Sequence, residues 1–391
     1  MSANRWNDFM WHQQQHMHNP IKVSLDLHDE STYVYSVDLA TGGLLSDCRV
    51  MGHYAKVKKH LKKIGPKGRI MIILEAGPHG FAPYRMFHNA GYEVKMIAPS
   101  SIPRAARDRK RKTDRDDAIN NLHYHLSGNL RYVDIPSMEE ESGRECLRFR
   151  CRSVWNITRE KQRIHSLMKR QGKVFTLTKS YWTKKHYEWL RQIELSPSIR
   201  VVLDGHLMQI QLMEQQVVLL EKQLASFFNA NPILQKRLNF YQLLAGFGPI
   251  NSMAMVLEGR DFNRFRHPKQ IMSFTGLNPG KRQSGNKDPI IAITKSGNTA
   301  LRTAFVGAAK YYGDYRLLHS SKKIEKMPKV LGEFIQRCQT RLNHVYRSLK
   351  ARGKATNKAR VAVARELCGW LWEFCTKIIP VLDKEPLAVA A

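Results

Sequence analysis

The order of the apolar segments between Ile21 and Ile97 constrains the fold more than any other feature of this sequence. In the first two segments, Ile21–Leu27 and Thr32–Leu39, apolar and polar residues alternate and β-branched residues are frequent, and Leu44–Val50 is a plausible third strand after the turn at Thr41-Gly42-Gly43. Alternation predicts strands with one buried face, and the turn-like residues between them predict antiparallel neighbours. A continuous apolar run, Arg69–Leu74, follows and is typical of a strand buried on both faces, and Tyr92–Ile97 reads as another buried strand.

Helices are expected between and after these two buried strands. Tyr54–Ile64 reads as a short basic helix ended by Gly65-Pro66, and Phe81–Asn89 as a helix that ends before Gly91. Three antiparallel strands followed by two strands that alternate with helices is the order of a ribonuclease-H-like (Holliday-resolvase-like) fold. The predicted fold class is therefore α/β for the N-terminal part of the chain.

The middle of the chain has the pattern of two long helices. Glu139–Gly172 is basic and amphipathic, with Arg144 and four further arginines outside a predicted apolar stripe that includes Cys151. Between Ile199 and Phe228, apolar residues recur at steps of three and four, as in a coiled-coil seam. We expect a hairpin arm, and the seam suits either a bundle within one chain or a dimer.

Charge indicates the class of partner. Lys and Arg total 64 against 33 for Asp and Glu, a formal net charge of +31. Nucleic acid is the polyanion that fits best, because each neutralised phosphate releases condensed counterions. A membrane surface is the rival, but no apolar run approaches the length of a membrane span and no signal-peptide or lipidation pattern is present. The six cysteines form no CxxC pair, which is typical of reduced thiols in a cytoplasm.

Four carboxylates are candidates for a metal site. Asp26 lies in the first strand, where a lone charge is costly unless it is paired or binds a cation, and Glu75 follows the fourth strand. These two strands are neighbours in the expected fold, so the two side chains would converge. Asp114 and Asp117 are three apart on a predicted helix and share one face, whereas Asp116 points elsewhere. Four oxygen donors suit Mg²⁺ (or Mn²⁺), or two such ions about 4 Å apart.

Simpler interpretations of these carboxylates remain open. Asp26 could make an ordinary hydrogen bond at a strand end. Asp114 and Asp117 could be the acidic first turn of a helix, stabilised by its dipole.

Basic and glycine-rich segments are candidates for contacts with nucleic acid. Leu243–Pro249 resembles a helix-hairpin-helix turn, in which glycines let backbone N–H groups reach a phosphate. A basic loop precedes the helix at Thr113, and Lys295 and Arg302 follow in the second half. The predicted nucleic-acid-binding residues are Arg104, Arg107, Arg109, Lys110, Arg111, Lys112, Arg115, Gly246, Gly248, Lys295 and Arg302.

These motifs together resemble one family, the DEDD transposases of insertion sequence family one-ten, which also includes site-specific DNA invertases. In the first half the resemblance lies in Leu25-Asp26-Leu27-His28, Leu74-Glu75-Ala76-Gly77 and Lys112-Thr113-Asp114-Arg115-Asp116-Asp117-Ala118. In the second half it lies in Gly276-Leu277-Asn278-Pro279, Gln283-Ser284-Gly285, Ile293-Thr294-Lys295-Ser296-Gly297-Asn298 and Leu301-Arg302. The resemblance covers Ile21 to Tyr312, and the joint order of the motifs is specific.

The resemblance implies a mechanism and partners. Asp26, Glu75, Asp114 and Asp117 correspond to the metal carboxylates, and Ser284 to a serine that attacks a DNA phosphate and is transiently joined to the DNA end. The family implies an element-encoded bridge RNA that pairs with donor and target DNA, and homodimers that assemble into homotetramers, with the carboxylates and the serine of one site supplied by different protomers.

The expected organisation follows from the resemblance and the patterns together. We expect a flexible leader at 1–20, a ribonuclease-H-like DEDD catalytic domain at 21–138 and a helical, coiled-coil arm at 139–236. A mostly helical C-terminal transposase domain with the serine nucleophile would span 237–321, and a basic helical tail 322–391. The expected location is a bacterial or archaeal cytoplasm, in association with the nucleoid.

Three functions compete on this sequence. The first is an RNA-guided transposase or recombinase that uses Ser284 and the DEDD site. The second is a junction resolvase or nuclease in which water is the nucleophile and Ser284 is structural. The third is a basic nucleic-acid-binding protein without enzymatic activity, in which the acidic residues are incidental.

Overall fold

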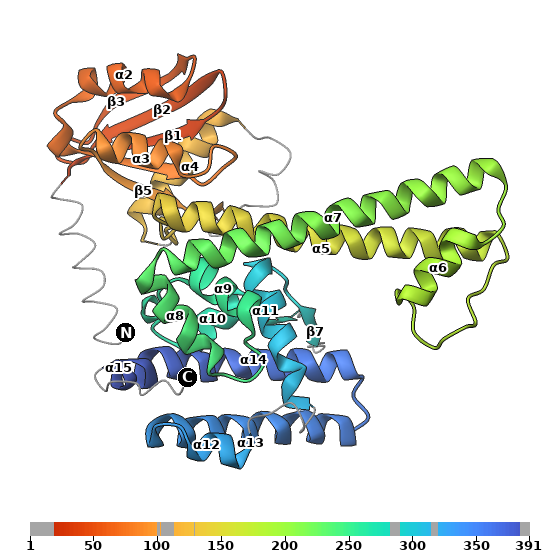
Figure 1. The fold of residues 1–391 in the computed structure, drawn as a ribbon. Coiled ribbons are helices and arrows are strands. Elements are labelled where there is room, and N and C mark those ends of the chain that lie inside the picture. The colour runs from red at the N-terminus through yellow and green to blue at the C-terminus, as the bar shows by residue number, and fades with distance from the viewer. Residues whose placement is uncertain are drawn as a thin grey trace. The chain divides into compact units, whose positions relative to one another are not determined.

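A computed structural model describes residues 19–99, 102, 113–128, 130–281, 290–313 and 320–383 of the chain (Figure 1). The chain divides into two compact units, Met1–Ile135 and Pro136–Ala391, and each has its own hydrophobic core. Among the described residues, no helix combines the length and apolar character that crossing a membrane requires.

The Met1–Ile135 unit is built on one five-stranded mixed sheet. Its strands are β1 (Ile21–Leu27), β2 (Ser31–Asp38), β3 (Gly43–Met51), β4 (Ile70–Glu75) and β5 (Glu93–Ile97). They lie in the order β3-β2-β1-β4-β5. The first three are antiparallel to one another, whereas β4 is parallel to both β1 and β5. The predicted set of five strands is confirmed, and so is the expectation that the first and fourth strands are neighbours.

Helices cover both faces of this sheet. They are α2 (Val57–Ile64), α3 (Ala82–Asn89) and α4 (Asp114–Leu126). Val57 of α2 and Phe87 of α3 are fully buried against Leu25 and Leu74 on one face. Leu122 of α4 packs with Ile73 and Ile97 on the other face. Alternation along a strand therefore sends Leu25 toward α2 and α3, and its neighbour Asp26 toward the face that α4 covers.

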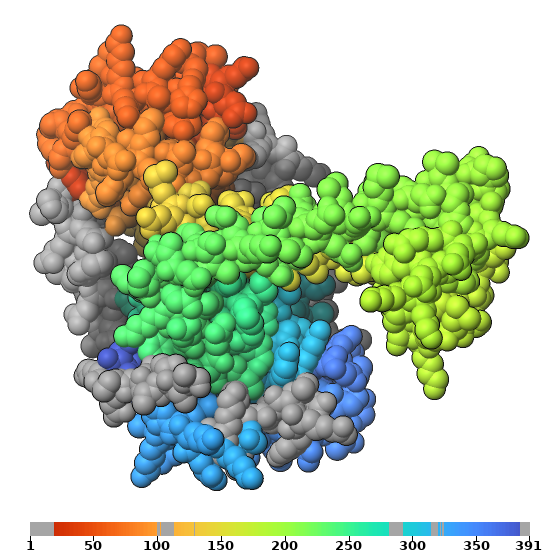
Figure 2. Space-filling view, viewed as in Figure 1, coloured from red at the N-terminus to blue at the C-terminus, as the bar shows by residue number. Residues whose placement is uncertain are grey.

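The Pro136–Ala391 unit begins with the two predicted long helices, α5 (Met138–Arg170) and α7 (Pro197–Asn229). They run antiparallel, because Arg150 pairs with Glu221 while Lys161, further along α5, pairs with Glu214. Together they form an arm with α6 (Lys184–Gln192) at its far end (Figure 1). Beyond its base, this arm stands clear of the rest of the unit (Figure 2). In the arm, α5 packs against α7 of the same chain. Pairing of the arm with a second chain as a coiled coil stays a prediction.

Two residues of α5 lie differently from the predicted stripe. Arg144, expected outside, is buried, because its guanidinium donates hydrogen bonds of 3.2 and 2.9 Å to the carbonyl oxygen of Leu257. Cys151, expected inside, is exposed. The small Ser153 is buried instead, where its hydroxyl donates to the carbonyl of Phe149.

A mostly helical body follows the arm. Its helices are α8 (Pro232–Gln242), α9 (Pro249–Ala254), α10 (Pro268–Phe274), α11 (Thr299–Ala309), α12 (Ser321–Glu325), α13 (Lys329–Ala351), α14 (Thr356–Glu373) and α15 (Ile379–Leu382). Its short strands are β6 (Pro279–Lys281) and β7 (Ile290–Ile293). The mixed architecture, an N-terminal sheet domain and a helical C-terminal region, agrees with the predicted fold class. Leu331 of α13 and Leu367 of α14 share one core with Phe305 of α11, so the basic tail packs on the body.

Candidate functional site

The sheet register brings Asp26 and Glu75 to one edge and one face of the N-terminal sheet. Leu25 of β1 pairs with Leu74 of the parallel strand β4, and Asp26 and Glu75 are the next residue of each strand. Since side chains alternate, both carboxylates leave the sheet on the face opposite the two leucines. Glu75 also pairs with Ile97 of β5, whose side chain lies in the core under α4.

The first turn of α4 presents Asp114 and Asp117 over this edge. The helix begins there because Thr113 caps it, and the Thr113 hydroxyl oxygen accepts from the backbone N–H of Asp116 at 3.1 Å. The Thr113 hydroxyl in turn donates to the Asp116 carboxylate at 2.7 Å. Asp116 therefore has a capping role, and Asp114 and Asp117 are left on the face that packs across β1.

His28 links the carboxylates of β1 and α4. Its Nε2 atom lies 3.1 Å from Oδ2 of Asp26 and 3.2 Å from Oδ1 of Asp114. Arg49 of β3 reaches the second oxygen of Asp114, with Nη2 at 2.7 Å from Oδ2. Two carboxylates from distant parts of the chain are thus held together through cationic or hydrogen-bonding side chains.

The electrostatic setting of Asp26 favours a bound cation. Burial raises the pKa of Asp26, the nearby carboxylates of Asp114 and Asp117 raise it further, and His28 lowers it. Ligand atoms of Asp26, His28 and Asp114 all lie within 4.8 Å of one another. The carboxylates of Asp26, Asp114 and Asp117 lie near one another, and the His28 imidazole contacts the first two. A positive ion at this place would reduce the repulsion between these carboxylates.

Arg115, a predicted contact to nucleic acid, is engaged within the domain. Its guanidinium donates to both oxygens of Asp47, with Nη2 at 2.6 Å from Oδ2. The Tyr33 hydroxyl donates to the same carboxylate at 2.6 Å. The hydrogen bonds from Arg115 and Tyr33 lower the pKa of Asp47. About half of the Arg115 side chain stays exposed, so part of its surface is open to a ligand.

Residues of the second unit form a separate group around β6, β7 and α11. Arg302 donates from Nη1 to the carbonyl oxygens of Thr275 at 2.9 Å and Lys295 at 3.1 Å, so it holds the loop before α11. Lys295 is exposed and has a positive φ of 56°. Gly297 has a φ of 138°, and a Cβ there would lie 2.3 Å from the carbonyl oxygen of Phe274. This loop therefore requires glycine at 297.

The predicted helix-hairpin-helix turn joins α8 to α9. Gly246 has a φ of 85°, and a Cβ there would lie 2.6 Å from the carbonyl oxygen of Ala308 in α11. Gly248 precedes α9 as its N-cap, and a Cβ there would meet no atom within 4 Å. Close packing on α11 thus explains Gly246, whereas the surroundings of Gly248 are open.

Glu258 is a buried acid that sequence reasoning missed. It lies in a π-helical turn, Met255–Gly259, and its side chain is 1% exposed. Arg148 of α5 donates to both of its oxygens, at 2.7 and 3.1 Å, and Asn298 donates from Nδ2 at 2.7 Å. Because Asn298 caps α11 and follows Gly297, Glu258 ties the base of the arm to the loop before α11.

Several predicted site residues lie outside the described residues. They are Ser284 and the basic residues Arg104, Arg107, Arg109, Lys110, Arg111 and Lys112. The predicted leader also lies outside the described residues, apart from its last two.

His28 and Arg49 are further residues of the carboxylate site that the sequence did not assign. His28 follows Asp26 by two residues and shares its side of the strand, which is a usable signal. Arg49 lies one residue before the end of the predicted third strand, and only the sheet order β3-β2-β1 brings it toward α4.

Comparison with family models gives two matches. A model described as the transposase IS116/IS110/IS902 family matches residues 242–313. A model described as a transposase, of the DEDD type of IS110, matches residues 23–171. The second range contains all four carboxylates, and the first contains Ser284 and the loop before α11.

Similar proteins carry transposase names. A Sinorhizobium fredii protein, y4qE, is 30% identical over 344 residues, which cover 86% of this chain and 84% of that protein. The transposase for insertion sequence element IS1111A of Coxiella burnetii is 24% identical and covers 78% of each chain. The transposase for insertion sequence element IS1533 of Leptospira borgpetersenii is 24% identical over 66% of this chain and 75% of its own.

Proposed function

The chain belongs to the IS116/IS110/IS902 transposase family, and from this membership we propose that it cuts and rejoins DNA strands for an insertion sequence. Membership implies a DNA-binding enzyme that cuts DNA. The proposal assigns Asp26, Glu75, Asp114 and Asp117 to one metal site, and Ser284 to the role of nucleophile.

One observation carries the proposal. Parallel pairing of β1 with β4 sets Asp26 and Glu75 side by side, and His28 joins Asp26 to Asp114 at the start of α4. A structural acid in a strand needs one partner, whereas here the carboxylates of Asp26, Asp114 and Asp117 converge on a half-buried edge of the sheet. This convergence supports the family's DEDD site in preference to incidental carboxylates.

The residues present fit a divalent cation. The four proposed ligands are carboxylates, and hard oxygen donors of this kind suit Mg²⁺ or Mn²⁺. When bound, such an ion would stabilise negative charge on the attacking and leaving oxygens of phosphoryl transfer. The surrounding side chains do the positioning: His28 keeps Asp26 and Asp114 together, and Thr113 fixes the helix turn that carries Asp114 and Asp117.

The proposed chemistry passes through a serine ester. The Ser284 hydroxyl oxygen bonds to a DNA phosphorus while the bond from that phosphorus to a sugar oxygen breaks. The serine gives up its proton, and the released sugar hydroxyl takes one, so charge and atoms balance. A hydroxyl needs a neighbouring base or metal to become a good nucleophile, which is why both sites are required. The reverse step, by another sugar hydroxyl, rejoins strands without ATP.

The finer family properties extend the proposal. We assign the N-terminal sheet to a ribonuclease-H-like domain at 21–138, the arm to 139–236 and the serine domain to 237–321. The strand order supports the first assignment and the match over 242–313 supports the third, while the DEDD-type match over 23–171 continues from the sheet domain into α5. A structured guide RNA and a homodimer that assembles into a tetramer complete the proposed complex. The positive charge of +31 supports binding of two polyanions.

Paired variants of the acidic helix turn test the metal site. Asp26→Asn and Asp114→Asn should reduce DNA cleavage by at least about 100-fold, the scale of losing a group that acts on the transition state, with DNA affinity nearly unchanged. Asp116→Asn is the matched control on the same turn, because its carboxylate serves the Thr113 hydroxyl. Cleavage is measured on an end-labelled DNA duplex in Mg²⁺. Full cleavage by Asp26→Asn would exclude the assigned site.

A further inference from the structure

We propose that one exposed face of α5 binds the backbone and bases of nucleic acid. The face is defined by Phe149, Arg152, Trp155, Arg159 and Arg163, and is called the α5 stripe below. These residues follow one another at steps of three, three, four and four, so they lie along one side of the helix.

Exposed aromatic rings stacked with arginines are the first argument. The Trp155 side chain is 59% exposed, and the guanidinium carbon of Arg159 lies 4.5 Å from the centre of its ring. Phe149 is 40% exposed, with the guanidinium of Arg152 at 5.8 Å. Large exposed rings are costly in water, and a ring beside a guanidinium is the combination that stacks bases and holds phosphates in proteins that bind nucleic acid strands.

Unbalanced charge is the second argument. From Cys146 to Arg170, α5 carries eight Lys and Arg residues and a single acid, Glu160. Arg150 and Lys161 pair with glutamates of α7. By contrast, no carboxylate of the described residues lies within ion-pair distance of Arg152 or Arg159. Their charge is therefore directed at the solvent and at whatever binds there.

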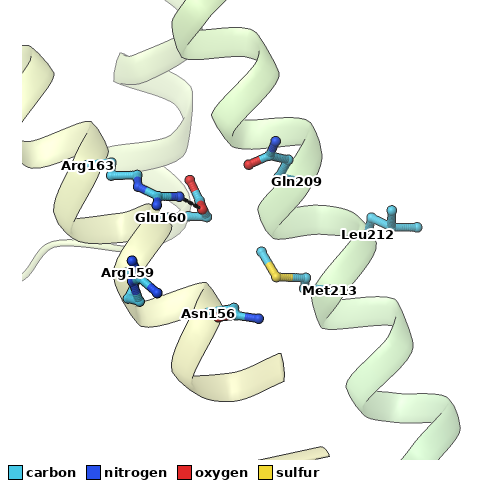
Figure 3. A pocket seen from close by; sticks show the side chains of 7 residues that line it. All are labelled: Asn156, Arg159, Glu160, Arg163, Gln209, Leu212 and Met213. Carbon is cyan, nitrogen blue, oxygen red and sulfur yellow. Dashed lines mark hydrogen bonds and ion pairs between the residues drawn. The ribbon is translucent and has the colours of Figure 1, made fainter. Parts of the chain in front are cut away.

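A pocket beside the stripe is the third argument. It has a volume of about 290 Å³ and lies between α5 and α7, lined by Asn156, Arg159, Glu160, Arg163, Gln209, Leu212 and Met213 (Figure 3). Two arginines and two amides around an apolar floor offer donors for phosphate and base edges beside a surface for a ring.

Glu160 fixes the charge at this pocket. Its side chain is buried, and it accepts a hydrogen bond from Arg163 (Figure 3). It also faces Nδ1 of His206 at 2.8 Å. One oxygen of Glu160 thus meets Arg163 of α5, and the other meets His206 of α7. With Glu160 compensated, Arg159 supplies the net positive charge of the pocket.

The spacing of the stripe matches a nucleic acid strand. Arg152 and Arg163 are eleven residues apart, which is about 17 Å along a helix. At about 3.4 Å per nucleotide, that length corresponds to about five nucleotides of one strand. A second copy of this face is a poor occupant, because it would bring arginine against arginine.

The proposal for the α5 stripe rests on one part of the proposed function, which is that the partner is a nucleic acid. It requires that the protein binds nucleic acid, not that Asp26 or Ser284 performs chemistry. All binding measurements are therefore made in the Asp26→Asn background, so loss of cleavage and loss of the stripe are read separately.

Three matched variants of the full chain test the stripe. The probes are fluorescein-labelled oligothymidylate, a DNA duplex and an RNA hairpin, each measured over a series of potassium chloride concentrations. Arg152→Ala with Arg159→Ala should lower the slope of log affinity against log salt by about 1.4 on the single strand, at about 0.7 per lost phosphate contact. Trp155→Ala should lower affinity by about 10- to 100-fold without changing that slope, and Trp155→Phe should restore most of it.

The control and the contrary outcomes are specific. Lys169→Ala with Arg170→Ala removes the same charge from exposed positions of the same helix, outside the stripe. An equal loss of affinity in this control pair would overturn the proposal, because binding would then depend on the overall charge of the helix and not on the α5 stripe. Unchanged affinity of all three probes in Trp155→Ala, with a change in oligomeric state by mass photometry, would also overturn it in favour of a protein interface. The probe that loses most affinity identifies RNA or DNA as the occupant.

Discussion

Asn298 donates a hydrogen bond of 2.7 Å from its Nδ2 atom to Oε2 of the buried Glu258. The same carboxylate receives Arg148 from the base of the arm, and Arg144 lies 3.7 Å from it. A single acid therefore connects a helix of the arm to the loop that precedes α11. That loop is part of the range, residues 242–313, matched by the model of the IS116/IS110/IS902 transposase family.

Removing Glu258 should destabilise the Pro136–Ala391 unit strongly. In Glu258→Ala, the buried Arg144 loses its counter-charge, and loss of one partner of a buried pair costs about 3 to 5 kcal/mol. Urea unfolding followed by tryptophan fluorescence measures the change, since Trp370 and Trp372 lie in this unit. Glu221→Ala, which breaks the more exposed pair with Arg150, should cost less than about 1 kcal/mol. Equal losses in the two variants would contradict the assigned role.

Ser284→Ala should abolish covalent protein–DNA adducts while leaving DNA binding unchanged. The reason is that only the hydroxyl oxygen can form the ester to phosphorus. Adducts are detected as slowly migrating labelled DNA on a denaturing gel, which protease treatment removes. Ser296→Ala, an exposed serine of the neighbouring loop, is the control and should form adducts normally. Cut DNA with free ends and no adduct in the unaltered protein would support water as the nucleophile instead.

Arg49→Ala should strengthen metal binding at the carboxylate site. Arg49 lies 2.7 Å from Asp114 and competes with a cation for the same oxygen. The pair is half exposed, so its loss should raise Mn²⁺ affinity by no more than about 5-fold. Isothermal titration with Mn²⁺ measures this, with Asp114→Asn as the variant that should bind weakly. Chelation with EDTA should stop cleavage, and added Mg²⁺ or Mn²⁺ should restore it.

Lys22→Met should stabilise the N-terminal sheet at neutral pH. Lys22 is fully buried in β1, with Nζ 3.7 Å from the sulfur of Met71, and burial lowers its pKa to about 8. The unfolded chain keeps an ordinary lysine pKa near 10.5, so it binds the proton more tightly than the folded chain. The variant should gain about 1 to 3 kcal/mol below pH 8. The gain should shrink as pH rises from about 8 to 10.5, because the unfolded chain then also loses the proton.

Hydrogen exchange of the β1 and β4 amides, corrected for intrinsic rates, is the suitable measurement for Lys22, since none of the described tryptophans lies in the Met1–Ile135 unit. Lys62→Met, at an exposed position of α2, is the control and should leave protection nearly unchanged. A Lys22→Met gain that does not vary with pH would rule out the titration and leave only better packing as its cause.

The N-terminal sheet could be predicted from sequence because its pattern is local. Alternation in β1 and β2 and the apolar run of β4 depend only on which faces are buried, and each predicted strand lies within a residue or two of its observed bounds. The convergence of Asp26 and Glu75 follows from the predicted pairing of the first and fourth strands, β1 and β4, which the observed register confirms.

Features that depend on distant contacts could not be predicted. Periodicity places Arg144 outside the apolar stripe of its helix. Its burial is explained only by its hydrogen bond to the carbonyl oxygen of Leu257, which lies far along the chain. Glu258 looks like any acid at a helix end, and its partners Arg148 and Asn298 come from separate elements. For the same reason Arg49 was not linked to Asp114, since they meet only through the sheet order.

The contacts of Arg144 with Leu257 and of Arg148 with Glu258 fix one end of α5, so the arm can act as a lever. A helix of 33 residues is about 50 Å long, and α5 is held near its first turns by Arg144 and Arg148. A force applied to α5 at Trp155 or beyond acts far from the point where Arg144 and Arg148 hold the helix. At Glu258 and Asn298, close to that point, the same force produces a smaller displacement and a larger local force. Binding of a ligand to the outer arm would in this way exert a force on Asn298, the N-cap residue of α11.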